Sequence, residues 1–333
     1  MAQAQKCRLV FMGTPDFAAR ILQKLASWPH GDIVAVYTQP DRPAGRGHKL
    51  TPSPVKQLAQ ELALQVLQPV NFRQADDIQT LAAFEPDLLI VAAYGLILPQ
   101  AVIDIPRIAP LNVHASLLPR YRGAAPIQRA IMENWQPGAQ TGVSIMRMVK
   151  ELDAGPVYVC ASLSIEEHTA GSLHDALSDL GAESLITVLE DIRAGVAIAS
   201  PQDENSVSYA AKMQKSDGLV LDWDRPAAAV HAQIRAVTPW PGARAVFFFN
   251  GQATPLELTL LPGKPLVSAG TGSPGQVFYN DGHLYVACSD GWYVLGAVKL
   301  QGRKFIQTSE FVNGYLRLSA HGLCGSAIPP PEN

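Results

Sequence analysis

Residues 111–127 read LNVHASLLPRYRGAAPI, and this stretch indicates the fold class of the first half of the chain. Its apolar opening, residues 111–115, predicts a short strand, and a helix is expected over about residues 127–133. Side chains two residues apart in a strand point to one face, so Asn112 and His114 should lie side by side. In open parallel sheets, ligands bind at the carboxyl end of strands. The pair is therefore a candidate site, although an isolated pair of this kind more often only satisfies backbone groups in a turn.

Strands and helices are predicted to alternate from residue 7 to residue 195. Helical spacing of apolar residues predicts three helices, over residues 16–25, 54–64 and 171–195. This alternation is typical of an α/β fold with a doubly wound parallel sheet. The first strand ends in GTPDF, which lacks two glycines of the dinucleotide-binding GxGxxG pattern. Mainly apolar runs predict the further strands, over residues 7–12, 33–37, 88–93 and 142–148.

The second half of the chain has a different pattern. Residues 196–208 are polar and aperiodic, which predicts a linker between domain 1–195 and domain 209–326. The proline-rich tail, residues 327–333, is expected to be disordered. Short strands separated by Asn-Gly and Asp-Gly turns predict a small β-barrel. These strands are expected over residues 219–223, 244–249, 256–261, 276–279, 283–288 and 292–300, with helices over 226–237 and 309–318.

Composition excludes several classes of protein. The formal net charge of -3 argues against a broadly basic nucleic-acid coat, but leaves room for a local basic patch. No run approaches the about 18 apolar residues of a membrane span, and no signal peptide is recognisable, so a cytoplasmic chain is expected. The four cysteines are scattered without a CxxC pair, which predicts neither a zinc site nor a disulfide framework. They are Cys7, Cys160, Cys288 and Cys324.

Two loops at predicted strand ends carry charged side chains. Residues 38–49 contain two prolines, two glycines and several basic residues, which predicts an exposed, mobile, positively charged loop. A solvated connection is the alternative. Asp153 lies in the glycine- and proline-containing loop after strand 142–148. A single loop aspartate usually forms a turn with its own backbone, so its role stays open at this point.

Five segments together resemble the methionyl-tRNA formyltransferases, a family within the wider folate-dependent formyltransferase and formyl-hydrolase superfamily. The Asn-x-His-x-Ser-Leu-Leu-Pro core with a downstream Asp indicates only the superfamily. The arginine-containing loop, the PWP segment and the second domain narrow the resemblance to the tRNA enzymes. The segments are NVHASLLPRYRGAAPIQ (112–128), TQPDRPAGRGHKL (38–50), AYGLILP (93–99), LDAGP (152–156) and RAVTPWPGA (235–243).

The resemblance implies a fold and a reaction. It implies a Rossmann-like N-terminal catalytic domain and a C-terminal OB-like β-barrel. The family transfers a formyl group from 10-formyltetrahydrofolate to the α-amino group of methionine on initiator tRNA. Its catalytic Asn, His and Asp correspond to Asn112, His114 and Asp153, and its folate-lining segment corresponds to Ser116, Leu117, Leu118 and Pro119. We add Tyr94, Gly95 and Leu96 to the expected folate site, since an apolar loop suits a flat pterin.

The expected tRNA-binding residues are all basic. Arg42 is the strongest candidate, because an arginine on a flexible tip can enter an opened acceptor end and become ordered there. The family's Gly-Lys-Lys segment corresponds here to the shifted Gly302-Arg303-Lys304. The further candidates are Arg46, His48 and Lys49 in the loop, and Lys212, Lys215, Arg235, Arg303 and Lys304 in the second domain.

Formyl transfer explains why these residue types occur together. The tetrahedral intermediate carries an oxyanion, which hydrogen-bond donors such as Asn112 and His114 can stabilise. The amine must lose a proton and the folate nitrogen must gain one, so His114 and Asp153 form an expected acid–base pair. The reaction needs no metal, and we expect neither a metal nor an obligate protein partner.

Three other functions remain open from the sequence. A sugar-amine formyltransferase or a formyltetrahydrofolate hydrolase could use the same three residues. A noncatalytic RNA-binding module is an alternative of another class, in which Asn112, His114 and Asp153 would be structural.

Overall fold

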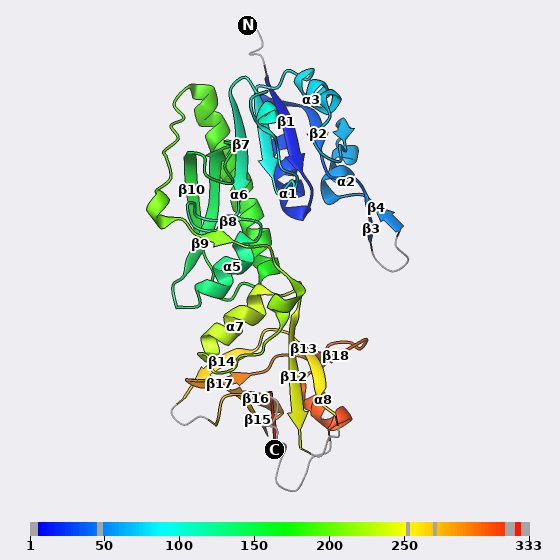
Figure 1. Ribbon diagram of the computed structural model, residues 1–333, viewed down its shortest axis with the longest axis vertical. Helices are drawn as coiled ribbons and strands as arrows, with labels where there is room; N and C mark the ends of the chain where they lie inside the picture. Colours follow the sequence, from blue (N-terminus) through cyan, green and yellow to red (C-terminus); the bar gives the residue numbers. More distant parts are fainter. Residues whose placement is uncertain (1–5, 45–48, 251–253, 269–271, 317–323, 328–333) are drawn as a thin grey trace. The chain divides into compact units, whose positions relative to one another are not determined.

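The computed structural model describes residues 6–44, 49–250, 254–268, 272–316 and 324–327 (Figure 1). The chain divides into two compact units whose sequence segments interleave. Unit 1 consists of Met1–Pro126, Thr141–Leu163 and His174–Ala210. Unit 2 consists of Ile127–Gln140, Ser164–Leu173 and Ala211–Asn333.

A seven-stranded sheet forms the centre of unit 1, in the order β10-β9-β7-β6-β1-β2-β5. The strands from β5 to β7 are parallel, which confirms the predicted α/β core. β9 is antiparallel to β7, so the sheet is mixed rather than wholly parallel. The strands are β1 (Cys7–Gly13), β2 (Gly31–Tyr37), β5 (Val66–Leu67), β6 (Leu88–Ala92), β7 (Ala109–His114), β9 (Gln140–Arg147) and β10 (Val157–Ser164).

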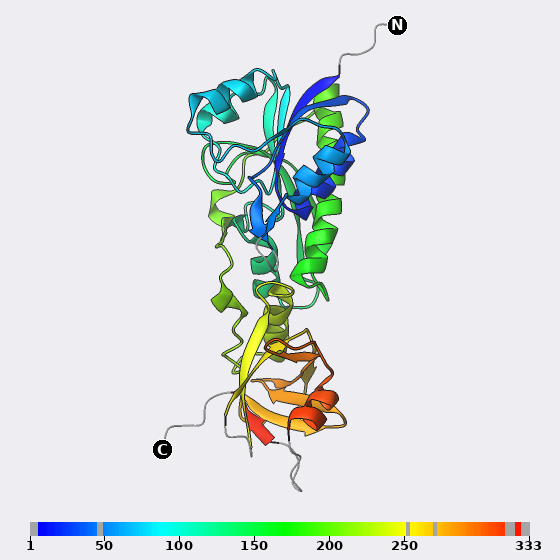
Figure 2. The same ribbon diagram turned by 90° about the vertical axis from the view of Figure 1, so that its right-hand side faces the viewer.

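Helices cover both faces of this sheet, as Figure 2 shows, which explains why strands such as β6 are apolar throughout. On one face, Val10 and Met12 pack with a cluster that includes Leu81 of α3 and Val102 of α4. On the other face, a Cβ built at Gly181 of α6 would lie 2.9 Å from Val113 Cγ1. The helices of unit 1 are α1 (Asp16–Ala26), α2 (Pro54–Glu61), α3 (Ala75–Ala82), α4 (Gln100–Ile103) and most of α6 (Ala170–Ala194). Apart from its first residue, α5 (Pro126–Glu133) belongs to unit 2.

The turn from β1 into α1 depends on a glycine. A Cβ at Gly13 would lie 2.9 Å from the carbonyl oxygen of Ala92, at the end of β6. Beyond it, Thr14 Oγ1 donates to the carbonyl oxygen of Tyr94 at 2.8 Å. This glycine therefore lets the chain turn between the carboxyl ends of the paired strands β1 and β6. After β1 the chain continues to β2 on one side of the pair, and after β6 it continues to β7 on the other side.

The predicted irregular loop over residues 38–49 is partly wrong. β3 (Arg42–Ala44) and β4 (Lys49–Thr51) pair as a short antiparallel ladder. Periodicity is not visible in strands of three residues, and a two-stranded ladder tolerates Pro43 because it needs few backbone donors. Residues 45–48, including Arg46 and His48, lie outside the described residues.

The segment predicted as a linker, residues 196–208, is bonded to unit 1. Val157 and Ser200 form an isolated antiparallel bridge, and Arg122 N donates to the carbonyl oxygen of Ser208 at 2.9 Å. It leads into β11 (Tyr209–Ala210), which pairs in parallel with β8 (Arg122–Gly123). The polar residues that suggest a linker in the sequence serve here as hydrogen-bonding partners.

Unit 2 contains an eight-stranded sheet in the order β14-β17-β16-β15-β19-β12-β13-β18. Its paired strands are antiparallel. Within the described ranges the edge strands β14 and β18 do not pair with each other, so the barrel stays a prediction. The strands are β12 (Ala243–Phe249), β13 (Leu256–Leu260), β14 (Lys264–Val267), β15 (Gln276–Asn280), β16 (His283–Ala287), β17 (Gly291–Val294), β18 (Val298–Leu300) and β19 (Cys324–Ser326), with helices α7 (Ala227–Ala236) and α8 (Thr308–Tyr315).

Two strand predictions in unit 2 are wrong. Residues 219–223 form no strand, because only Leu219 makes an isolated bridge while Trp223 is buried with Phe247 and Tyr293. Residues 292–300 form two strands rather than one. Gly296 interrupts them, and a Cβ there would collide with the carbonyl oxygen of Pro262. In the predicted tail, Ala327 N donates to the carbonyl oxygen of Gly275 at 2.8 Å, and residues 328–333 lie outside the described part of the chain.

His231 of α7 is a buried imidazole in unit 2. Its Nδ1 lies 3.2 Å from Tyr293 Oη, and its Nε2 lies 3.5 Å from the carboxylate of Glu167. Burial lowers the pKa of His231 below its ordinary value of 6.5, and the Arg235 cation acts in the same direction. The Glu167 carboxylate opposes this shift without cancelling it. The folded unit therefore favours the neutral imidazole.

We predict a pH-dependent stability that depends on His231. In the unfolded chain this histidine binds a proton near pH 6.5, whereas in the folded chain it does so only at lower pH. Protonation therefore favours the unfolded chain, so the free energy of unfolding keeps its full value above pH 6.5 and decreases as the pH falls below it. One such group can add a slope of at most about 1.4 kcal/mol per pH unit to the free energy of unfolding. The melting temperature of His231→Gln should fall less steeply between pH 7.5 and 5 than that of the parent or of the exposed control His283→Gln. Identical slopes would contradict the prediction.

Candidate active site

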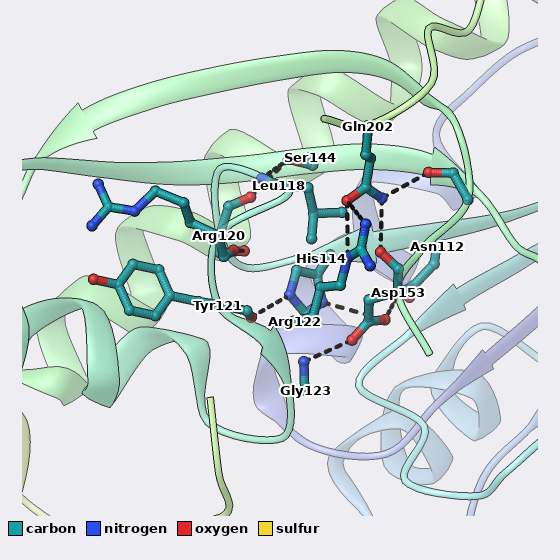
Figure 3. A network of polar contacts seen from close by, with 12 residues as sticks. Asn112, His114, Leu118, Arg120, Tyr121, Arg122, Gly123, Ser144, Asp153 and Gln202 are labelled. Carbon is teal, nitrogen blue, oxygen red and sulfur yellow. Dashed lines mark hydrogen bonds and ion pairs between the residues drawn. The ribbon is translucent and has the colours of Figure 1, made fainter. Parts of the chain in front are cut away.

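Asn112 and His114 lie on one face of β7, at its carboxyl end, as the period of two predicts (Figure 3). Leu111 and Val113, which alternate with them, are fully buried against the opposite face. Asp153 comes close to both polar residues. Asn112 Nδ2 lies 3.5 Å from Asp153 Oδ1, and His114 Nδ1 lies 3.7 Å from the same oxygen. The structure thus brings the three predicted catalytic side chains together in unit 1.

The imidazole of His114 is held by the backbone. Its Nε2 lies 3.0 Å from the carbonyl oxygen of Tyr121. Because a carbonyl oxygen can only accept, Nε2 must carry a proton, and Nδ1 is the atom that faces Asp153. The 3.7 Å from Nδ1 to Asp153 Oδ1 exceeds a hydrogen bond of ordinary length. The residue is only 6% exposed and its Nε2 is hydrogen-bonded, so the ring has a fixed orientation. Nδ1 is therefore the ring atom expected to exchange a proton with a substrate.

Asp153 reaches the site because the loop after β9 is tightly packed. Asp153 has a φ of 51°, in the left-handed region that aspartate tolerates better than most residues. Its Oδ2 accepts from the backbone N–H of Gly123 at 2.8 Å. Two residues on, a Cβ at Gly155 would collide with the carbonyl oxygen of Arg147, so only glycine fits. In the LDAGP sequence, Asp153 thus adopts the left-handed backbone conformation and Gly155 allows the close approach to Arg147.

Three polar side chains around Asp153 were not predicted. Gln202 Nε2 donates to the carbonyl oxygens of Asp153 and Gly155, each at 2.7 Å. Gln202 Oε1 accepts from Nε and Nη2 of Arg122, at 3.0 and 2.8 Å, and Arg122 also pairs with Glu204 at 2.8 Å. Hydrogen bonding to Glu204 raises the pKa of Arg122, while Arg122 lowers the pKa of Glu204. In the sequence, the polarity of Gln202 and Glu204 predicts only a linker, and Arg122 has no local feature that indicates its partners.

The predicted folate-lining segment forms a rigid turn after β7. Ser116 is fully buried, and its Oγ donates to the carbonyl oxygen of Arg120 at 2.6 Å. Ser144 of β9 fixes the same turn from the sheet. Its Oγ donates to the carbonyl oxygen of Ser116 at 2.7 Å and accepts from Leu118 N at 3.0 Å. Leu118 is buried and Leu117 is half-buried, so this segment presents little mobile surface.

The loop after β6 is divided between core and surface. The side chain of Tyr94 is 2% exposed and packs in the core cluster with Tyr37 and Phe72, rather than on a ligand slot. Burial raises the pKa of its phenol. Gly95 is exposed with a φ of 79°, and Leu96 is half-buried. Of the three predicted folate contacts in this loop, Gly95 and Leu96 retain accessible surface.

A large hollow in unit 1 involves none of these residues. Its volume is about 990 Å³, and its lining includes Cys7, Trp28, Asp87, Arg107 and Arg193. Cys7 begins β1 and Asp87 immediately precedes β6, so the hollow lies at the amino ends of these strands. The Asn112 group lies at the carboxyl end of a parallel neighbour. The size of the hollow therefore does not identify it as the site of the chemistry.

The predicted tRNA-binding residues have different environments. Arg42 is exposed and its Nη2 donates to Gln39 Oε1 at 2.6 Å. Arg235 is only 5% exposed and donates to the carbonyl oxygens of Glu166 and His168, so its prediction as a surface RNA contact is wrong. Lys49 lies in β4, with its side chain outside the description. The remaining candidates in unit 2 are exposed: Lys212, Lys215, Arg303 and Lys304.

Metal-binding groups and membrane-spanning helices are both absent from the sequence-based expectations, and the described residues bear on each. Among those residues, no three His, Cys, Asp or Glu side chains form a group that could hold a metal ion. The helices of the described segments include none with the length and apolar character needed to cross a bilayer.

Solved structures with the same fold include two proteins in complex with folate compounds. An N-formyltransferase from Helicobacter canadensis, in complex with folinic acid and dTDP-3-aminofucose, has a TM-score of 0.63 and 14% identity, covering 88% of this chain and 100% of its own. HypX from Aquifex aeolicus, in complex with tetrahydrofolic acid, has a TM-score of 0.57 and 20% identity, covering 92% and 48% respectively. At these identities the similarity shows the fold alone.

Sequence comparison gives a more specific result. The family described as formyl transferase matches residues 7–189, and the formyl transferase C-terminal domain matches residues 212–316. A methionyl-tRNA formyltransferase of Desulfovibrio desulfuricans is 54% identical over 337 residues, covering 100% of both chains. Another, from Nitratidesulfovibrio vulgaris strain DP4, is 48% identical and covers 95% of each. The chain therefore belongs to the formyl transferase family and, by this full-length similarity, to its methionyl-tRNA formyltransferases.

Proposed function

We propose that this chain transfers the formyl group of 10-formyltetrahydrofolate to the α-amino group of methionine on initiator tRNA. The observation that supports this best is the convergence of Asn112, His114 and Asp153 at the end of β7, in a chain that is 54% identical to a methionyl-tRNA formyltransferase. A transferase of this family needs donors for an oxyanion and groups that move protons, and these three side chains supply both.

The reaction replaces one carbon–nitrogen bond by another. The neutral α-amine attacks the formyl carbon, and the carbonyl oxygen becomes an oxyanion in the tetrahedral intermediate. The bond from carbon to the folate nitrogen then breaks, the amine loses a proton and the folate nitrogen gains one. Asn112 is a suitable donor to the oxyanion, because its amide lies at the strand end and makes only a long 3.5 Å contact with Asp153.

The proton transfers are assigned to Asp153 and to Nδ1 of His114. Because Nε2–H is engaged by the carbonyl oxygen of Tyr121, the ring can exchange a proton with substrate only through Nδ1. Nδ1 and Asp153 Oδ1 are 3.7 Å apart, so a substrate nitrogen or one water can approach both atoms. Asp153 accepts the proton of the amine, and protonated His114 supplies the proton of the leaving nitrogen, directly or through that water.

The folate and the tRNA use different parts of the chain. Backbone groups and apolar surface of residues 116–119, with Gly95 and Leu96, are proposed to hold the pterin. The tRNA phosphates and unpaired acceptor end are proposed to meet basic side chains, since RNA is recognised mainly by its backbone and unstacked ends. These are Arg42, Arg46, His48 and Lys49 in unit 1, and Lys212, Lys215, Arg303 and Lys304 in unit 2.

The proposed substrate can be tested directly. The protein is incubated with 10-formyltetrahydrofolate and, separately, with charged initiator methionyl-tRNA, charged elongator methionyl-tRNA and a nucleotide-linked amino sugar. We expect formylmethionine on the initiator tRNA above all. Formylation of the amino sugar alone would favour a sugar N-formyltransferase. Formate release without an acceptor would favour a hydrolase, and no turnover would favour the noncatalytic alternative.

Removal of the proposed oxyanion donor should slow catalysis without preventing binding. We expect Asn112→Ala to lower kcat by about 10²–10³, because loss of one preorganised donor has this effect in acyl-transfer enzymes. KM for both substrates should change little. The measurement is single-turnover transfer of labelled formyl groups to initiator tRNA, with Asn205→Ala as control, since Asn205 is exposed and bonds to Asp203 within its own turn. An unchanged kcat for Asn112→Ala would remove Asn112 from the mechanism.

Arg42→Ala should affect tRNA far more than folate. If Arg42 contacts a phosphate of the tRNA, the variant raises KM for tRNA and reduces the slope of log affinity against log salt concentration by about 0.7–0.9. KM for the folate should stay within about twofold, given that the contact is to RNA only. The control is Arg73→Ala, an exposed arginine outside the loop. Equal losses on both substrates would show that Arg42 does not distinguish the tRNA.

A further inference from the structure

The amide of Gln202 has one possible orientation in its network (Figure 3). Arg122 carries only donors, so the atom that accepts from its Nε and Nη2 must be the amide oxygen. The amide nitrogen then donates to the carbonyl oxygens of Asp153 and Gly155, at 2.7 Å each. Both N–H groups and the oxygen are thereby used. Gln202 therefore links the loop of Asp153 to the guanidinium of Arg122, and we call this set of hydrogen bonds the Gln202 clip.

This clip holds a backbone conformation that is unfavourable by itself. At a φ of 51°, Asp153 lies in a backbone region that is unfavourable for L-residues, although aspartate is among the more tolerant types. Gln202 holds its carbonyl oxygen, and the backbone N–H of Gly123 holds its carboxylate. Without the clip, the carboxylate would still be tethered by Gly123, but the backbone could return to a common φ. The direction of Oδ1 towards Asn112 and His114 would then change.

The partner of Gln202 is itself firmly placed. The Arg122 side chain is 3% exposed, and its guanidinium contacts both Gln202 and Glu204. Arg122 and Gly123 form β8, which pairs with Tyr209 and Ala210 of β11. Ser208 Oγ also accepts from Tyr121 N at 2.9 Å, next to the carbonyl that holds His114. The segment from residue 200 to residue 210 thus fixes the backbone on both sides of the Asp153–His114 contact.

We propose that Gln202 is a positioning residue for formyl transfer, acting through Asp153. It touches no reacting atom. It holds the Asp153 loop in the left-handed conformation that directs Oδ1 towards Asn112 and His114. The proposal rests on the catalytic role of Asp153 proposed above.

Kinetics of two variants test this role. We expect Gln202→Ala to lower kcat by about 10- to 100-fold, since a displacement of about 1 Å in a catalytic group can have this effect. KM for folate and tRNA should stay within about twofold of the parent, because the proposal gives Gln202 no contact with either substrate. Gln202→Glu should lose as much, because a carboxylate still binds Arg122 but cannot donate to two carbonyl oxygens. If Gln202→Glu is as active as the parent, Gln202 serves only to hold Arg122, and the proposal fails.

The control is Asn205→Ala, an exposed residue of the same segment, which should keep the parent kcat and melting temperature. A loss of kcat in Gln202→Ala that is matched by partial unfolding at the assay temperature, seen by circular dichroism, would overturn the positioning role.

A double-variant comparison separates this proposal from the role of Asp153 itself. In the Asp153→Ala background, Gln202→Ala should cause no further loss of single-turnover rate. A full second loss would mean that Gln202 acts elsewhere. If Asp153→Ala alone keeps the parent rate, the catalytic assignment of Asp153 fails first.

A second measurement does not need activity. In protein labelled with [¹⁵N]histidine, Gln202→Ala should move the ring resonances of His114 in the same direction as Asp153→Ala does. The double variant should resemble Asp153→Ala alone. Unmoved His114 resonances in Gln202→Ala would overturn the proposal, even if Asp153→Ala proved too slow to assay.

Discussion

Parallel pairing of the buried strands β1, β6 and β7 is the constraint on which the site depends. Parallel neighbours end at the same edge of the sheet, so the chain must make several turns there in a small space. Gly13 at the end of β1, and Ala93, Tyr121 and Asp153 with their left-handed backbone conformation, all occur in these turns or in the loop that meets them. Backbone strain of this kind persists only where surrounding bonds overdetermine it.

The bonds that overdetermine these turns are mostly between side chains and backbone. His114 is held by a carbonyl oxygen, Asp153 by an N–H and an amide, and Ser116 by a carbonyl oxygen four residues on. Such bonds fix direction more than they add net stability, because each replaces a bond to water and contributes only about 0.5–1.5 kcal/mol. The apolar core stabilises unit 1, and the polar network sets the angles of its catalytic groups.

The sequence predicted the parts of the fold whose signal is local. Continuous apolar runs located β1 and β6 to within one residue of either end, and a period of two placed Asn112 and His114 on one face. Asp153 could not be placed this way. It follows β9, which runs antiparallel to β7, so the end of β9 pairs with the beginning of β7 and not with the end that bears His114. Only the loop's return path brings Asp153 to His114, and the family resemblance, not periodicity, indicated it.

Other failures have the same physical origin. The polarity of Gln202 and Glu204 predicts a linker, because the sequence does not indicate whether a polar side chain bonds to water or to another part of the protein. The positive charge of Arg235 predicts a contact with RNA, but its Nη1 donates to two backbone carbonyls inside unit 2. Residues 219–223 contain the apolar residues of a strand, yet their burial depends on Trp223 packing and not on a ladder. In each case the structure of the residue depends on a contact with residues that are distant in the sequence.

The attachment of residues 200–210 to unit 1 also sets where this protein can be cut or recombined. The matched N-terminal family region ends at residue 189, and α6 ends at Ala194, so a fragment ending there looks complete by secondary structure. Such a fragment would lack Gln202, Ser208 and β11, and with them the bonds that hold Asp153, Tyr121 and Gly123. A minimal catalytic fragment, or a chimera that exchanges second domains between relatives, should therefore keep its own chain through Ala210.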